Sequence, residues 1–124
     1  MSYNASKQHV LFTARAAAIL INAEADAAVL NVNQTLDGWV QVYIDFTVGS
    51  LTNAVFTPQI NDGSGWYNVT DPGALTLTAS AAKAFAVCCK GAKQFRIAVT
   101  STGTVTNSSA TVKYGWQDAG GATG

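Results

Sequence analysis

The 124-residue sequence predicts an all-β protein, an antiparallel β-sandwich of about seven or eight strands with an extended N-terminal arm. Two observations lead to this prediction. Between residues 38 and 48, apolar and polar side chains alternate with a period of two, which is the pattern of a strand that buries one face. Turn signals rich in Gly, Asn, Asp and Ser then recur about every eight to twelve residues, which is typical of a sandwich.

The sequence divides into three regions. Residues 1–15 are predicted to form an N-terminal arm, residues 16–117 the β-sandwich domain, and the Gly/Ala-rich residues 118–124 a flexible C-terminal tail. Within the sandwich, residues 14–30 are rich in alanine, which suits a helix by propensity. They show no helical stripe, however, and their apolar residues fall in two short runs, so we interpret this stretch as strand.

The arm carries one short apolar cluster and no clear period. We expect it to become ordered only against a neighbour, because burial of apolar side chains must offset the entropy of ordering a mobile segment. The alternative is that these residues form the first strand of the sandwich. The side chains of the arm that are candidates for this interface are Tyr3, Val10, Leu11 and Phe12.

The remaining strands follow from alternation and from the turns between them. A second long strand is predicted at residues 52–60, where Pro58 cannot donate to a ladder and therefore indicates an edge or a bulge. Shorter strands are predicted at residues 66–69, 75–78, 85–89, 94–100 and 108–116. The side chains expected to be buried together are Val40, Val42, Ile44, Phe46, Phe56, Phe95, Ile97, Val99 and Val112.

Charge and composition restrict the partners. Seven basic and seven acidic residues give a formal net charge of zero, and 11% of the residues are charged, against roughly 25% in typical soluble domains. Nucleic-acid binding needs a basic stripe, so we expect no nucleic acid. Low charge favours a surface covered by partners. An equally good interpretation is a β-protein kept soluble by Thr, Ser and Asn side chains.

The cysteines and the apolar runs restrict the location. Cys88 and Cys89 are adjacent, so in a strand they point to opposite faces, and they lack the further ligands of a metal site. We interpret both as free thiols of a protein made in a reducing cytoplasm. The N-terminus lacks a signal-peptide pattern, and the longest apolar run, residues 16–21, is too short to span a bilayer, so we expect no membrane.

Catalysis finds no support in the sequence. The only histidine, His9, lies in the predicted arm, and the acidic residues fall mostly in turns or at strand ends. The turn at residues 61–65 lacks the repeated acidic ligands of a calcium loop. We therefore expect a protein that is not an enzyme, with no catalytic residues, no cofactor and no metal.

Exposed aromatic residues are better candidates for function. Trp39 and Tyr43 fall on the face opposite the predicted core, and Trp66 and Tyr67 follow a turn. Such aromatics can anchor a protein interface, stack on a sugar, or cover a second layer of the sandwich. The sequence leaves all three interpretations open.

Several of these features occur together over residues 27–116. A polar arm precedes a long strand at Val40–Thr47, and a turn with aromatics follows at Asn61–Val69. Gln94–Val99 and then Thr102–Thr106 lead into a final strand. In this combination the chain resembles the small β-sandwich capsid decoration, or cement, proteins of tailed bacteriophages.

The resemblance implies a structural virion protein, commonly a homotrimer. Such a protein binds the outside of the phage head and stabilises contacts between subunits of the major capsid protein. It would be made in the cytoplasm of the host bacterium and would reside on the outer capsid surface. The alternatives are a glycan-binding β-sandwich module of a phage tail or baseplate, and a component of a tail tube or connector.

Overall fold

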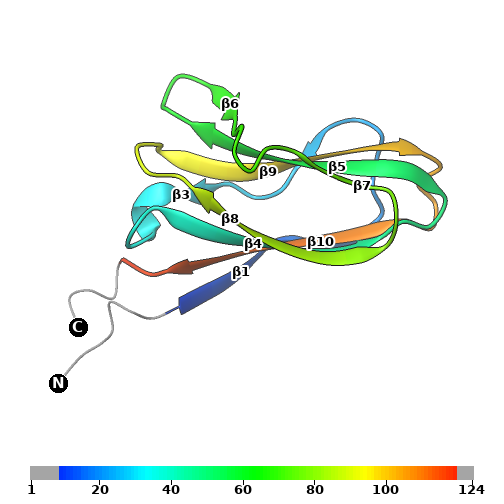
Figure 1. Ribbon diagram of the computed structural model, residues 1–124, viewed down its shortest axis with the longest axis horizontal. Coiled ribbons are helices and arrows are strands. Elements are labelled where there is room, and N and C mark those ends of the chain that lie inside the picture. The colour runs from blue at the N-terminus through cyan, green and yellow to red at the C-terminus, as the bar shows by residue number, and fades with distance from the viewer. Residues whose placement is uncertain (1–8, 120–124) are drawn as a thin grey trace.

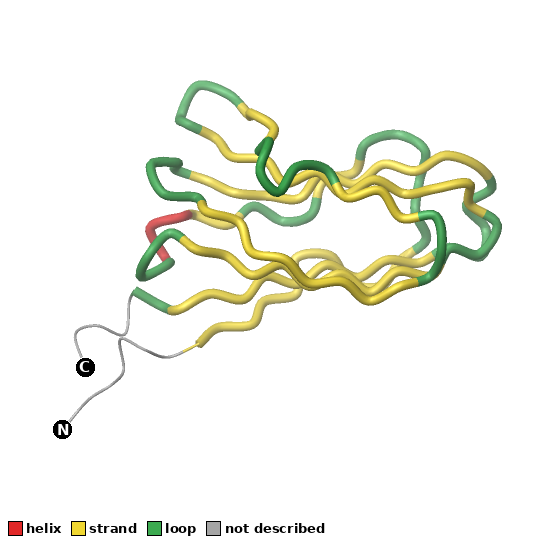
Figure 2. Tube along the Cα trace, in the orientation of Figure 1, coloured by secondary structure: helices red, strands yellow, loops and turns green. Residues whose placement is uncertain are grey.

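Two antiparallel sheets packed face to face make up the computed structural model, which describes residues 9–119 (Figures 1 and 2). Sheet A has four strands in the order β1 (His9–Ala18), β10 (Ser109–Gln117), β4 (Trp39–Thr47) and β8 (Ala81–Cys88). Sheet B has six strands. Four follow the order β2 (Ala25–Asp26), β9 (Gln94–Gly103), β5 (Leu51–Asn61) and β6 (Trp66–Asn68). In addition, β3 (Leu30–Asn31) pairs with β9, and β7 (Leu75–Leu77) pairs with β5. The predicted antiparallel sandwich is confirmed.

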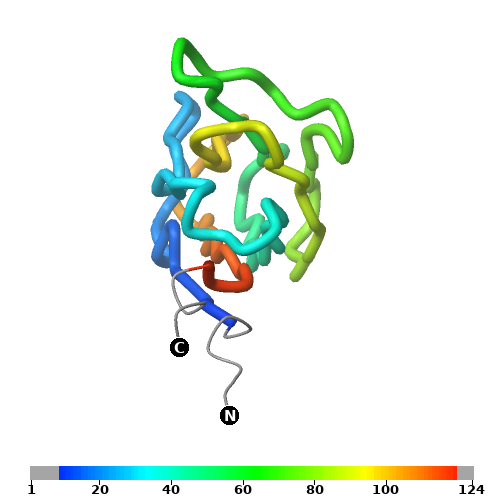
Figure 3. The backbone as a smooth tube through the Cα atoms, turned by 90° about the vertical axis from the view of Figure 1, so that its left-hand side faces the viewer, coloured from blue at the N-terminus to red at the C-terminus, as the bar shows by residue number. Residues whose placement is uncertain are grey.

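Figure 3 shows the backbone from one end of the sandwich, turned by 90° from Figure 1. The core side chains come from both sheets and pack between them. In β4, the residues from Val40 to Phe46 alternate between buried and outward-facing as predicted, and in β10 the residues from Ala110 to Trp116 alternate between buried and half-buried. Aromatic rings join the layers: Phe46 of sheet A meets Phe56 of sheet B edge-on, with 5.9 Å between ring centroids. All nine residues predicted as a common core are buried in one cluster.

The prediction of an N-terminal arm is wrong for residues 9–15, because they belong to β1. This strand pairs antiparallel with β10 in a register that sets His9 opposite Gln117 and Phe12 opposite Tyr114. Val10 is half-buried against the core. The centroid of the Phe12 ring lies 6.3 Å from the ring centroids of both Tyr114 and Trp116. Residues 1–8 lie outside the described part of the chain.

The predicted tail also begins too early. A β-bridge joins Asp118 to Thr35, and the Ala119 amide donates a hydrogen bond of 2.9 Å to the Gln34 carbonyl. Both residues are therefore fixed on the sandwich. Residues 120–124 lie outside the described residues.

The alanine-rich stretch forms little regular structure after β1 ends at Ala18. Leu20 is buried, and its amide donates to the Ser108 hydroxyl, so the segment is fixed by single contacts instead of a ladder. A 3₁₀ turn, η2 (Val32–Gln34), follows β3. The prediction of strand over helix is confirmed where β1, β2 and β3 lie. The residues between these strands form neither strand nor helix. No helix among residues 9–119 is long and apolar enough to cross a bilayer.

Pro58 does not mark an edge strand, because β5 is central in sheet B. On one side β5 pairs with β9 throughout; on the other, β7 pairs with Ala54–Phe56 and β6 with Gln59–Asn61. The Pro58 carbonyl accepts a hydrogen bond from the Val69 amide on this second side. In an antiparallel strand the nitrogen and the carbonyl of one residue point to the same side, so the Pro58 nitrogen, which has no proton to donate, also faces the gap between β6 and β7. The proline therefore interrupts no ladder.

Candidate functional site

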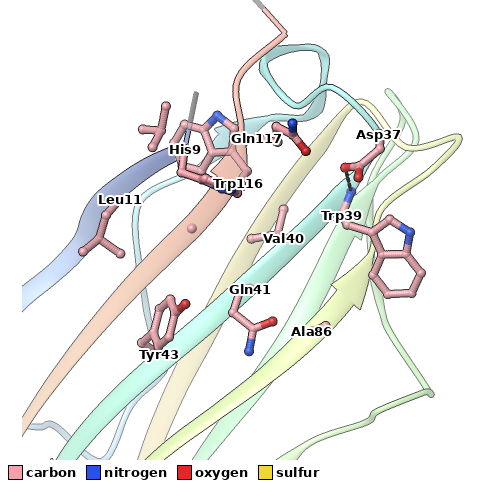
Figure 4. Close-up of a pocket in the computed structure, with 12 residues that line it drawn as sticks. His9, Leu11, Asp37, Trp39, Val40, Gln41, Tyr43, Ala86, Trp116 and Gln117 are labelled. Carbon is pink, nitrogen blue, oxygen red and sulfur yellow. Dashed lines mark hydrogen bonds between the residues drawn. The ribbon is translucent and has the colours of Figure 1, made fainter. Parts of the chain in front are cut away.

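The outer face of sheet A carries a groove of about 480 Å³ (Figure 4). β4 supplies Trp39, Gln41 and Tyr43 to it, because these residues alternate with the buried set. The register places Gly115 of β10 and Ala86 of β8 on either side of Gln41. We define the outer groove by Leu11, Trp39, Gln41, Tyr43, Ala86 and Gly115.

Large side chains stand at the borders of the outer groove and small ones form its floor. Leu11 is 64% exposed, Trp39 44% and Tyr43 42%, which are high values for apolar and aromatic residues in strands. A Cβ atom added to Gly115 would lie 3.2 Å from Tyr43 Cε2, so the glycine lets the Tyr43 ring lie close over β10. The groove therefore offers apolar contact area on a rigid sheet.

One end of the groove is polar. The Trp39 amide donates a hydrogen bond of 3.1 Å to Asp37 Oδ1, which fixes the turn before β4 (Figure 4). His9 and Gln117 lie at the same end. Trp116 is also there, 8% exposed, and its buried Nε1 has no hydrogen-bond acceptor among residues 9–119.

Four of the predicted interface residues come together at this groove, and three do not. Val10, Leu11, Trp39 and Tyr43 line it. Phe12 points to the other face of β1, toward Tyr114 and Trp116, and is 39% exposed at the sheet edge. Trp66 and Tyr67 lie on β6 of sheet B. The eighth residue, Tyr3, is outside the described residues.

Trp66 is engaged within the molecule. The Arg96 guanidinium carbon lies 4.0 Å from the centroid of its ring, in a cation–π contact. The same guanidinium forms an ion pair of 3.0 Å with Asp26 and donates to Gln59. Trp66 of β6 therefore packs on Arg96 of β9, and Arg96 in turn contacts Asp26 of β2. Tyr67, by contrast, is 48% exposed beside the turn at residues 61–65.

Sequence reasoning missed the floor of the groove. Gln41, Ala86 and Gly115 are small or polar, so none has the character of an anchor. In the structure Gly115 faces outward, because it lies between the buried residues Tyr114 and Trp116 of β10. The register between β10 and β4, which sets it beside the Tyr43 ring, cannot be derived from composition.

Two ionisable groups whose pKa values are raised lie in the core and not in the outer groove. Burial raises the pKa of the Cys89 thiol to about 12, assisted by the neighbouring Cys88, and burial also raises the pKa of Tyr114. Both groups face the core. In the part of the chain that the structure describes, no three His, Cys, Asp or Glu side chains are placed to hold a metal ion. As predicted, the two cysteines differ in exposure and are free thiols; the structure shows that Cys88 is the exposed one and Cys89 the buried one.

Comparison with known proteins gives similarity at the level of the fold. No protein-family model matches the sequence, and no curated protein does. Among solved structures, PBSX exported protein XepA aligns with a TM-score of 0.64 and 11% identity over 94% of this chain. The chain spans 39% of the length of XepA.

Two further structures match over most of both chains. A subunit of Bacillus endospore appendages, described as disulfide-linked pili, has a TM-score of 0.59 at 12% identity, covering 94% of this chain and 96% of that one. SPBc2 prophage-derived protein YomS has a TM-score of 0.53 at 16% identity, covering 87% and 91%. What these proteins share with the chain is the sandwich.

Proposed function

We propose that the protein is a non-enzymatic structural component of a phage particle, a capsid decoration protein that binds the outside of the head as a homotrimer. The observation that carries the proposal is the outer groove, an apolar and aromatic surface on a rigid sheet. Exposed Trp39, Tyr43 and Leu11 have the character of interface anchors, and the small floor residues leave room for side chains of a partner.

Two further observations support this role. The fold is shared with a prophage-derived protein and with a subunit of a polymeric appendage. The sequence resembles decoration proteins over residues 27–116. In the proposed mechanism, each bound copy buries surface shared by neighbouring major capsid subunits, so rupture of the shell must first break these contacts.

The experiment is binding to heads. Genome-filled heads from the phage that encodes the protein, stripped of it, are incubated with the wild-type protein and with the double variant Trp39→Ala/Tyr43→Ala, and pelleted. We expect the double variant to bind at least about tenfold more weakly, because each anchor contributes roughly 1–2 kcal/mol. Thr57→Ala, on the outer face of sheet B, is the matched control and should bind as the wild type does. Equal binding by all three proteins contradicts the proposal.

A glycan-binding module of a tail or baseplate is the second candidate. Trp39 and Tyr43 border the groove and Gln41 lies between them, an arrangement that can stack on a sugar ring and hydrogen-bond its hydroxyls. Mass spectrometry of separated heads and tails distinguishes the two functions. Glycan binding is favoured if the protein is in the tail fraction and host polysaccharide quenches tryptophan fluorescence in the wild type but not in Trp39→Ala.

A further inference from the structure

Sheet A ends on both sides in strands with an unpaired outer edge. Among the described residues, β8 pairs only with β4, and no other strand lies along its outer edge. β1 pairs only with β10; its outer edge is used at Ala14, whose carbonyl accepts from Ala28. The segment His9–Thr13 of β1 is therefore left open.

The β8 edge lacks the features that normally protect such a strand. Natural proteins protect edges with charges, prolines or bulges. β8 has no proline, keeps one unbroken register with β4 over all its residues, and carries a single charge, Lys83. Its backbone is thus a regular template that another extended segment can continue.

We propose that the open segment of β1 in one copy pairs with β8 of a second copy, so that sheet A continues from subunit to subunit. Strand direction allows it. The strands β1, β10, β4 and β8 alternate in direction, so β8 of one copy and β1 of an equally oriented next copy are antiparallel. The inference rests on the proposed homotrimer and names the contact that builds it.

Side chains on the two edges are complementary. On the outer face, β8 presents the small residues Ala84 and Ala86, whereas β1 presents Leu11, which is 64% exposed. A register with Leu11 opposite Ala86 places a large side chain beside small ones. It also places His9 opposite Cys88 and Thr13 opposite Ala84.

The inner faces match as well. Beside β8 lies a notch of about 160 Å³, lined by residues 72–75 and 83–85, among them Phe85 and Lys83. In the same register Phe12 of the neighbour lies opposite Phe85 and can enter this notch. The contact would bury Phe12, one of the large apolar side chains that the single subunit leaves exposed, and would place Leu11 beside Ala86 at the border of the next copy's groove.

This contact is head-to-tail, so it closes into a ring when the rotation between copies permits. The outer faces then lie side by side and form a continuous surface. A zero net charge adds no repulsion between the copies.

The test uses the native Cys88 as a reporter of register. In the variant His9→Cys, the new thiol lies opposite Cys88 of the next copy, and mild oxidation should produce a ladder of disulfide-linked oligomers on non-reducing gels. Thr13→Cys, on the same strand and face but opposite Ala84, is the matched control. We expect at least about tenfold less cross-linking from it, because a disulfide requires Cβ atoms about 4 Å apart. The pair Thr13→Cys/Ala84→Cys should restore the ladder.

Charge on the edge gives an independent readout. Ala84→Lys, on the β8 edge but outside the outer groove, should shift the wild-type oligomer to monomer in analytical ultracentrifugation at micromolar concentration, whereas Thr47→Lys, exposed at the far end of the outer face, should not. Thermal melts verify that both variants fold. A monomeric wild type without a His9→Cys ladder overturns the inference. Dimers of Ala84→Cys alone also overturn it, because they indicate pairing of β8 with β8. Head binding is measured separately. A protein that binds heads through the outer groove but does not assemble through β1 and β8 would show normal head binding without the disulfide ladder.

Discussion

At the scale of single residues, β4 shows how one strand serves two environments. Phe46 is 4% exposed and packs edge-on against Phe56 across the sandwich, whereas Tyr43, on the other face, is 42% exposed. The same backbone geometry that hides one aromatic presents the other to a partner. Changes on the two faces should therefore affect different properties, stability on one and binding on the other.

Replacing Phe46 with alanine tests the buried face. We expect the free energy of unfolding to fall by roughly 3–5 kcal/mol, because the change removes contacts with Phe56 and leaves a cavity between the sheets. Urea denaturation measures the loss. Thr47→Ala, the exposed neighbour on the same strand, is the control and should change stability by about 0.5 kcal/mol or less. Equal effects of the two changes would mean that Phe46 is not a core residue.

At the scale of elements, the sequence predicts the strands that bury the side chains of one face, but it does not predict an edge strand whose side chains stay largely exposed. β4 and β10 alternate cleanly because each lies between two neighbours and has the core beneath it. β1 is at the edge, where both Leu11 and Phe12 remain exposed, and register shifts occur on either side of Arg15. Its pattern therefore has no period of two, which is why it was predicted to be an arm.

Arg15 shows what holds this irregular strand in place. Its guanidinium donates to the carbonyls of Ala18 and Ile19 at distances of 3.2 and 3.1 Å, and also to the Ala110 carbonyl of β10. These bonds satisfy carbonyl groups at the point where the register shifts and the ladder is incomplete. A cation at this position cannot be recognised as structural from sequence spacing.

Removing half of β1 tests whether it belongs to the sandwich. A variant without residues 2–12 should lose roughly 2–4 kcal/mol of stability, because it uncovers Tyr114 and Trp116, on which Val10 and Phe12 pack. Its melting temperature is compared with that of a variant lacking residues 2–8 only, so that the difference reports on His9–Phe12. Identical melting curves would show that His9–Phe12 contribute nothing to the folded state.

At the scale of the whole molecule, one buried hydroxyl links the two sheets. The Tyr114 hydroxyl, from β10 of sheet A, donates to the Ala28 carbonyl at 2.9 Å and accepts from the Ile97 amide of β9 at 3.0 Å. Burial raises the pKa of Tyr114, and burial likewise raises the pKa of Cys89 to about 12 from its ordinary 9.0. The folded state thus retains protons that the unfolded chain releases.

The protein should therefore lose stability in alkali. Above pH 9, where the ordinary Cys89 thiol ionises, the unfolded chain binds fewer protons than the folded one, so the free energy of unfolding falls as pH rises. Tyr114 adds to the decline above pH 10. Urea denaturation between pH 7 and about 12 measures it. Cys89→Ala should reduce the slope from pH 9 and Tyr114→Phe the slope from pH 10, whereas Cys88→Ser should keep the decline. A flat profile in the wild type would contradict both assignments.

The pairing of β1 with β10 also has a consequence for how the protein is made. These strands are the first and the last of the described chain, yet they are neighbours in sheet A. Contacts so distant in sequence close late and slowly, since a long loop must be ordered before they form. During translation, the Leu11 and Phe12 side chains must therefore wait for β10 while every other strand is synthesised. We expect the nascent chain to depend on chaperones in that interval, with sheet A completed only after β10 has left the ribosome.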